Sequence, residues 1–137
     1  MITVPNLTLT GRLGDDLRLI IAIRDPDTGD MLSTPTWTAR MQVRLQAGEP
    51  GAPLLDLETG QSTTAGSGLS FDTDGNFELL IKAADIGSLP VSATPPTDVS
   101  LAYDVKMRDD GGDIATYLAG VLVITTPATL DPPPSAG

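Results

Sequence analysis

Residues Val99 to Thr125 read VSLAYDVKMRDDGGDIATYLAGVLVIT and contain two strand patterns joined by a turn. In the first half, apolar residues alternate with polar or small ones, which is the period-2 pattern of a strand with one buried and one solvated face. The apolar positions of this pattern are Val99, Leu101, Tyr103, Val105 and Met107. The connector 109–113, DDGGD, is rich in residues that suit tight turns, so a β-hairpin is expected.

The second strand pattern, 115–125, is apolar on both faces. One face carries Leu118, Leu122 and Ile124, and the opposite face carries Tyr117, Val121 and Val123. A strand that is apolar on both faces needs cover on both, and soluble monomers usually avoid an exposed apolar ridge. We therefore place Val121 in the core and assign Leu118, Leu122 and Ile124 to an interface with another subunit.

Further strand patterns occur throughout the rest of the chain. Alternating or short apolar segments predict further strands at 2–13, 17–24, 37–46, 54–57, 69–72 and 77–81, with 17–24 as a central strand. The Ala-rich segment 83–88 ends near Gly and Pro and predicts one helical turn. These elements favour an all-β fold, an antiparallel immunoglobulin-like β-sandwich of about eight strands. The sandwich should span residues 1–126, followed by an extended Pro-rich tail at 127–137.

The core of this sandwich should combine the apolar phases of several strands. We expect five residues to pack together: Tyr103, Trp37, Phe77, Leu19 and Val121. Trp37 is the only Trp, and its spacing with other apolar residues favours a core position over a binding platform.

Composition excludes some functions and disfavours others. The chain has 137 residues, which predicts one domain. Its 18 acidic and 8 basic residues give a net charge of −10, which argues against nucleic acid and anionic membranes as partners. Cys and His are absent, which removes thiol chemistry, the usual general base and the commonest metal ligand. We predict no enzymatic activity, no catalytic residues and no cofactor, and we expect a chain without a secretory signal or membrane span.

Two Asp-rich segments invite comparison with calcium loops. They are DPDTGD at 25–30 and DTDGN at 72–76. Both lack the further acidic ligands and the closing Glu of an EF-hand, whereas Asp and Gly are common turn formers. Asp72 and Asp74 could also be an acid–base pair, but neighbouring aspartates at a strand end are more commonly turn formers. We therefore interpret both segments as turns and predict no metal site.

Arg40 and Arg44 share the polar face of the predicted 37–46 strand. They could form a patch for an acidic partner, or they could balance carboxylates on a solvated sheet face. The second interpretation is favoured because exposed charge pairs are common and individually weak. Both residues nevertheless join Leu118, Leu122 and Ile124 as candidates for a partner interface.

The order of several short motifs resembles a family of virion structural proteins of tailed bacteriophages. The resemblance is to the N-terminal domain of baseplate upper proteins and to related small tail or fibre-associated proteins. The matching motifs are RMQVR at 40–44, GNFELLI at 75–81, AAD at 83–85, YDV at 103–105 and GVLVI at 120–124. They span roughly residues 16–126.

This resemblance implies a virion subunit that is made in the host cytoplasm and acts by protein–protein assembly. Its partners would be other virion proteins, with the chain present as a homo-oligomer or in many copies. The first expectation is a tail, baseplate or fibre-attachment adaptor. A capsid decoration or head-fibre base protein is an alternative. A carbohydrate- or protein-binding β-sandwich used for recognition is another, because fold does not settle function.

Overall fold

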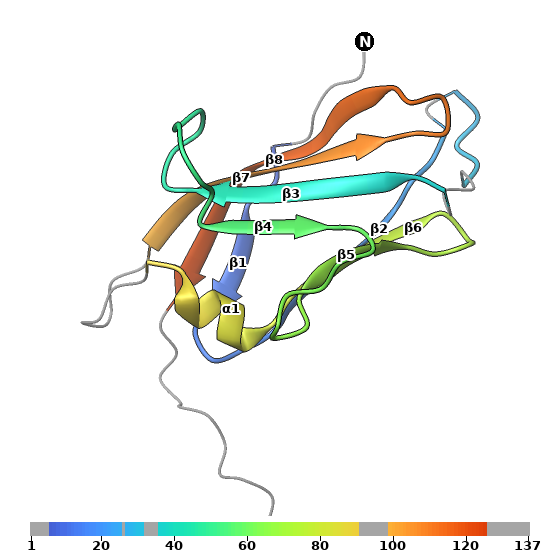
Figure 1. Cartoon of the computed structure of the whole chain (residues 1–137). Coiled ribbons are helices and arrows are strands. Elements are labelled where there is room, and N and C mark those ends of the chain that lie inside the picture. The colour runs from blue at the N-terminus through green and yellow to red at the C-terminus, as the bar shows by residue number, and fades with distance from the viewer. Residues whose placement is uncertain (1–5, 26, 32–35, 91–98, 126–137) are drawn as a thin grey trace, which may run out of the picture.

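The computed structural model describes residues 6–25, 27–31, 36–90 and 99–125. Two sheets pack face to face (Figure 1), one with strand order β1-β8-β7-β3-β4 and one with order β2-β6-β5. The elements are β1 (Leu9–Arg12), β2 (Leu17–Ala22), β3 (Thr38–Arg44), β4 (Leu55–Glu58), β5 (Gly68–Phe71), β6 (Asn76–Ile81), α1 (Ala83–Ser88), β7 (Val99–Arg108) and β8 (Ile114–Thr125). The predicted all-β sandwich with one short helical turn is confirmed.

The β7–β8 hairpin lies within the five-stranded sheet. Its turn closes with a hydrogen bond from the Asp109 N–H to the Asp113 carbonyl at 3.0 Å. On its other side β7 pairs antiparallel with β3, from Thr38 opposite Arg108 to Arg44 opposite Ala102. The predicted hairpin is therefore confirmed, and β7 lies in the middle of the larger sheet.

The first and last described strands lie side by side. β1 runs parallel to β8, with Leu9 opposite Leu122 and Arg12 opposite Thr125. The Leu13 N–H continues this pairing by donating to the Thr125 carbonyl at 2.9 Å. This pairing joins the two ends of the described fold within one sheet.

β2 was expected to be a central strand, and this prediction is wrong. β2 lies at the edge of the three-stranded sheet, and β6 is the central strand there. The run of apolar residues around Ile20 suggested cover on both faces. In the structure only the inner face is covered, and Ile20 on the outer face remains 57% exposed.

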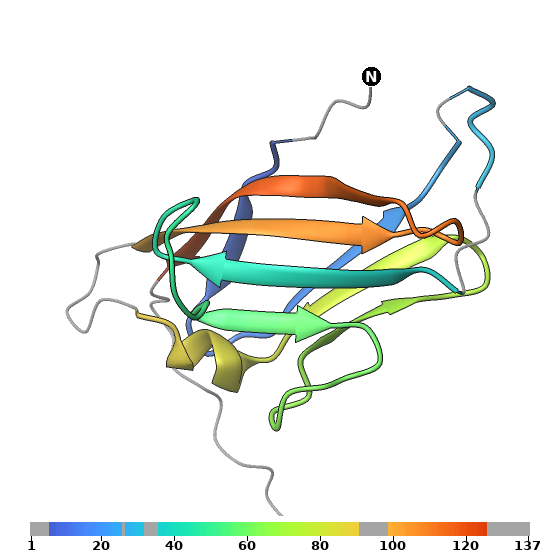
Figure 2. The same ribbon diagram turned by 45° about the horizontal axis from the view of Figure 1, so that its top comes forward.

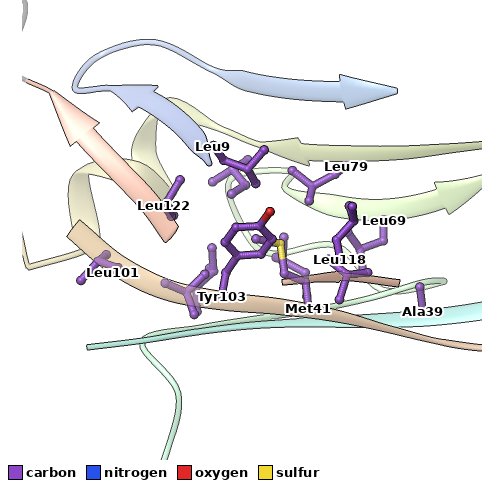
Figure 3. Packing of buried hydrophobic residues seen from close by; sticks show 14 of the residues in the cluster. Leu9, Ala39, Met41, Leu69, Leu79, Leu101, Tyr103, Leu118 and Leu122 are labelled. Carbon is purple, nitrogen blue, oxygen red and sulfur yellow. The ribbon is translucent and has the colours of Figure 1, made fainter. Parts of the chain in front are cut away.

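The core lies between the two sheets. Figure 3 shows Tyr103 pointing from β7 into a cluster that includes Met41, Leu79 and Leu122. Of the five residues expected to pack together, Tyr103 and Phe77 are buried, and Leu19 and Trp37 are partly buried against the cluster.

Val121 was expected in this core and is instead 39% exposed on the outer face of β8. The cause is a bulge in β8. Lys106 lies opposite Thr116 but Val105 lies opposite Leu118, so Tyr117 is an extra residue in the pairing. One extra residue exchanges the two faces of the strand beyond it, which turns Val121 outward and Leu122 inward.

Gly120 lies opposite Tyr103 and lets the chain before β1 approach β8 closely. The Tyr103 hydroxyl donates to the Leu7 carbonyl at 2.6 Å, and burial raises the pKa of this phenol. A Cβ atom at position 120 would lie 2.5 Å from the Leu7 carbonyl oxygen. The absence of a side chain at Gly120 is therefore required for this contact.

Gly120→Ala is expected to lower the free energy of unfolding by about 2 to 4 kcal/mol, because it combines a backbone clash with an unfavourable φ of +156°. Chemical denaturation monitored by circular dichroism measures this loss. Gly48→Ala is the matched control, because Gly48 has a φ of +75° with nothing within 4 Å of the added Cβ. Equal losses in the two variants would contradict the importance of the close approach.

The Pro-rich tail expected at 127–137 lies outside the described residues. Among the described residues, no helix has the length and apolar character needed to cross a membrane.

Candidate functional site

Most basic residues of the chain lie on one surface, the outer face of the five-stranded sheet. They point outward because they alternate with buried residues along their strands. This basic face consists of Arg12, Arg40, Arg44, Lys106 and Arg108, which are five of the eight Lys and Arg residues in the sequence. Figure 2 looks onto this sheet, with β8, β7, β3 and β4 side by side and the three-stranded sheet behind them.

Arg40 is held by carboxylates on the neighbouring strand β4. Its Nε lies 2.9 Å from Asp56 Oδ1 and 3.4 Å from Glu58 Oε1, and its Nη2 lies 2.5 Å from Asp56 Oδ2. The hydrogen bond with Arg40 lowers the pKa of Asp56, and the same bond raises the pKa of Arg40. Because these side chains are substantially exposed, the ion pair orients Arg40 more than it stabilises the fold.

Arg44 binds backbone oxygens of the loop that follows β3. Its Nη1 donates to the carbonyls of Glu49 at 3.1 Å and Gly51 at 2.6 Å. Its Nη2 donates to Gln42 Oε1 at 3.1 Å. Arg40 and Arg44 thus have partners within the chain, in line with the favoured interpretation of a balanced sheet face.

Lys106 and Arg108 differ from these arginines, because within the described part of the chain their side chains form neither an ion pair nor a hydrogen bond. They line a shallow hollow of about 510 Å³, together with Arg40, Glu58 and the exposed side chain of Ile114. The hollow therefore combines available positive charge with some apolar surface.

An apolar strip lies beside the basic face on the same side of the sheet. Its residues are partly exposed, and they are Ala102, Ala119, Val121 and Val123. Val121 lies directly opposite Ala102, and Val123 lies opposite Thr10 of β1. A flat surface that joins apolar residues to a charged rim is typical of protein–protein contacts.

Leu118, Leu122 and Ile124 do not contribute to this surface. All three are buried in the core of the chain itself, where Leu122 lies opposite Leu101 and Leu118 opposite Val105. Their assignment to a partner interface was wrong, because the bulge at Tyr117 exchanges the two faces of β8. Val121 and Val123, from the set expected inside, are the residues that β8 presents outward.

Lys106 and Arg108 were missed as candidate site residues. The signal was present in the sequence, since both alternate with the buried residues Val105 and Met107 in the most regular strand pattern of the chain. What the sequence did not show is that β3 would bring Arg40 opposite Lys106. The cluster results from this pairing.

The Asp-rich turns use their carboxylates to bind their own backbone. Asp25 Oδ1 accepts the N–H of Asp27 at 2.8 Å, and Asp109 Oδ1 accepts those of Gly111 and Asp113. The interpretation of these segments as turns is confirmed.

Asp72 Oδ1 likewise accepts the Asn76 N–H at 2.9 Å, which is the main cause of its lowered pKa. Throughout the described ranges, no group of three or more acidic side chains is arranged to hold a metal ion. The prediction that the chain binds no metal stays a prediction.

Comparison with models of protein families and with curated protein sequences finds no match. The features of the chain that bear on function are therefore the outer sheet face and the sequence motifs.

Proposed function

We propose that this protein is a structural subunit of a tailed-phage virion that acts by protein–protein assembly, as a tail, baseplate or fibre-attachment adaptor. The observation that carries the proposal is the outer face of the five-stranded sheet. This face has five basic residues and an apolar strip in a chain whose net charge is −10. A surface whose charge is opposite to that of the rest of the chain is suited to contact with an acidic protein surface.

The arrangement of strands and the sequence motifs also support this proposal. Strands β2-β6-β5 in one sheet and β8-β7-β3-β4 in the other follow the B-E-D and G-F-C-C′ order of immunoglobulin-like sandwiches. We infer an immunoglobulin-like domain on this basis, with the first strand paired to β8. Four of the five motifs that resemble phage proteins lie wholly or mainly in β3, β6, β7 and β8.

Purified virions provide the direct test. After gradient purification and a salt wash, quantitative mass spectrometry should find the chain in a fixed ratio to the major structural proteins. Absence of the chain, or a ratio that varies between preparations, would contradict a structural role. The position of the chain in an electron-microscopy reconstruction would separate a tail adaptor from capsid decoration.

The hollow on the basic face favours a second candidate, a module that recognises a glycan or a peptide. Its lining includes Arg108, Glu58 and Asp104, which offer hydrogen-bond donors and acceptors to a polar ligand. For this candidate, oligosaccharides or peptides should bind to the isolated protein, and Arg108→Glu should abolish the binding. The number of copies per virion should then vary between preparations.

A further inference from the structure

The acidic residues of the chain are concentrated at one end of the sandwich. Three turns, at 25–30, 72–76 and 109–113, lie toward this end (Figure 1), and in Figure 2 the segment 27–31 projects away from the other two. The Ile23 N–H donates to the Gly75 carbonyl at 2.8 Å, and Thr36 Oγ1 donates to Asp110 Oδ1. The first bond joins the end of β2 to turn 72–76, and the second holds turn 109–113 beside the start of β3. We call the three turns together the acidic end.

The acidic end carries eight carboxylates with little local compensation. They are Asp25, Asp27, Asp30, Asp72, Asp74, Asp109, Asp110 and Asp113. The only basic residue in 23–31, 72–76 or 109–113 is Arg24, whose Nη1 donates to the Gly29 carbonyl at 2.9 Å. Arg108 of the basic face directly precedes turn 109–113, so the acidic end and the basic face adjoin there. At neutral pH this end is therefore strongly negative.

The basic face has the complementary charge. It carries five basic residues against the carboxylates Asp56, Glu58 and Asp104, which leaves a charge of +2 over the whole face. The residues that line the hollow include Arg40, Lys106 and Arg108 against Glu58 and Asp104, which leaves +1 there. The rest of the sequence has three basic and fifteen acidic residues, which leaves −12. A second copy of the chain thus presents the type of surface that the basic face attracts.

We propose that the acidic end of one copy docks on the basic face of a second copy. Residues 27–30 of one copy enter the hollow beside Lys106 and Arg108 of the other. The carboxylates of Asp27 and Asp30 are suited to this role. The backbone N–H groups of these residues form hydrogen bonds, but among the described residues neither carboxylate does. The proposal rests on the proposed function in taking the chain to act in many copies.

This contact restricts the ways in which copies of the chain can assemble. The two surfaces in contact are different patches of the same chain, so the contact is heterologous. A heterologous contact repeats from copy to copy and forms either a closed ring or an open filament. Association should also weaken with salt, because exposed charges are screened.

Charge reversal in two places tests the proposal. The face variant carries Lys106→Glu and Arg108→Glu, and the end variant carries Asp27→Lys and Asp30→Lys. Sedimentation velocity should show that the wild-type chain associates in about 0.1 M salt and dissociates in about 1 M salt, where the Debye length falls to about 3 Å. Each variant alone should lose association by about tenfold or more, because like charges then meet at the contact.

Mixing the two variants gives the decisive measurement. The acidic end of the face variant still fits the basic face of the end variant, so the mixture should regain association. Lys106→Glu alone should also weaken association, and Arg18→Glu is its control, since it changes the net charge equally from the outer face of the other sheet and should leave association unchanged. Circular dichroism checks that each variant is folded.

A wild-type chain that stays monomeric in low salt would overturn the proposal, as would a mixture that fails to associate. If the chain is monomeric but present in virions at a fixed ratio, this inference fails and the proposed function stands. If the chain associates as described but is absent from virions, the docking stands and the virion role fails.

Discussion

Phe77→Ala is expected to lower the free energy of unfolding by about 3 to 5 kcal/mol, because it removes a buried aromatic ring and leaves a cavity in the core. Phe77 is fully buried on β6 and is the largest of the completely buried side chains. Its ring centroid lies 5.2 Å from that of Phe71, and it lies opposite Ile21 of β2. Loss of this ring removes packing from all three strands of the smaller sheet.

Urea denaturation with two spectroscopic probes measures this loss. Leu45→Ala is the control, because Leu45 is 49% exposed and should cost less than about 0.5 kcal/mol. A loss for Phe77→Ala as small as that of the control would show that the two sheets are not packed around this ring.

Leu122→Asp is expected to prevent folding, whereas Val121→Asp should yield a folded protein. The two residues are neighbours on β8, but Leu122 is completely buried beside Leu101 and Val121 is 39% exposed. A carboxylate at position 122 would be buried without a partner, which costs several kcal/mol and is comparable to the whole stability of a domain of this size. At position 121 the carboxylate would lie in solvent.

Soluble yield and thermal unfolding of the two variants measure this difference. Folded Leu122→Asp together with unfolded Val121→Asp would mean that β8 presents its other face to the core. If the proposed function is correct, Val121→Asp should also weaken incorporation into virions, because it places a charge in the apolar strip.

The local elements of this protein follow from its amino-acid sequence alone. The alternation of apolar and polar residues placed the strands that became β3, β6 and β7, and the composition of 83–88 placed the helical turn of α1. The Asp- and Gly-rich segments at 72–76 and 109–113 were correctly interpreted as turns. These features depend on residues close in the chain, so the periodicity and the turn chemistry are sufficient to predict them.

Which face of β8 is buried depends on contacts between segments far apart in the chain. A regular hairpin would have placed Tyr117 opposite Val105 and Val121 opposite Leu101, which turns the wrong set inward. The bulge shifts this register by one residue, and Tyr117 then packs at 6.0 Å from the ring of Trp37, more than seventy residues earlier in the chain. Both faces of β8 are apolar, so the sequence pattern held no signal for this choice.

The edge position of β2 and the formation of the basic face also depend on which strands pair with each other. β2 is apolar around Ile20, yet only β6 pairs with it. The basic face forms because β3 and β7 bring Arg40 opposite Lys106, although these residues lie far apart in the chain. Such pairings are settled by the packing of whole sheets, because each strand pattern is compatible with several neighbours. The strand patterns therefore predicted which residues share a face, and the assembled sheets decided what each face meets.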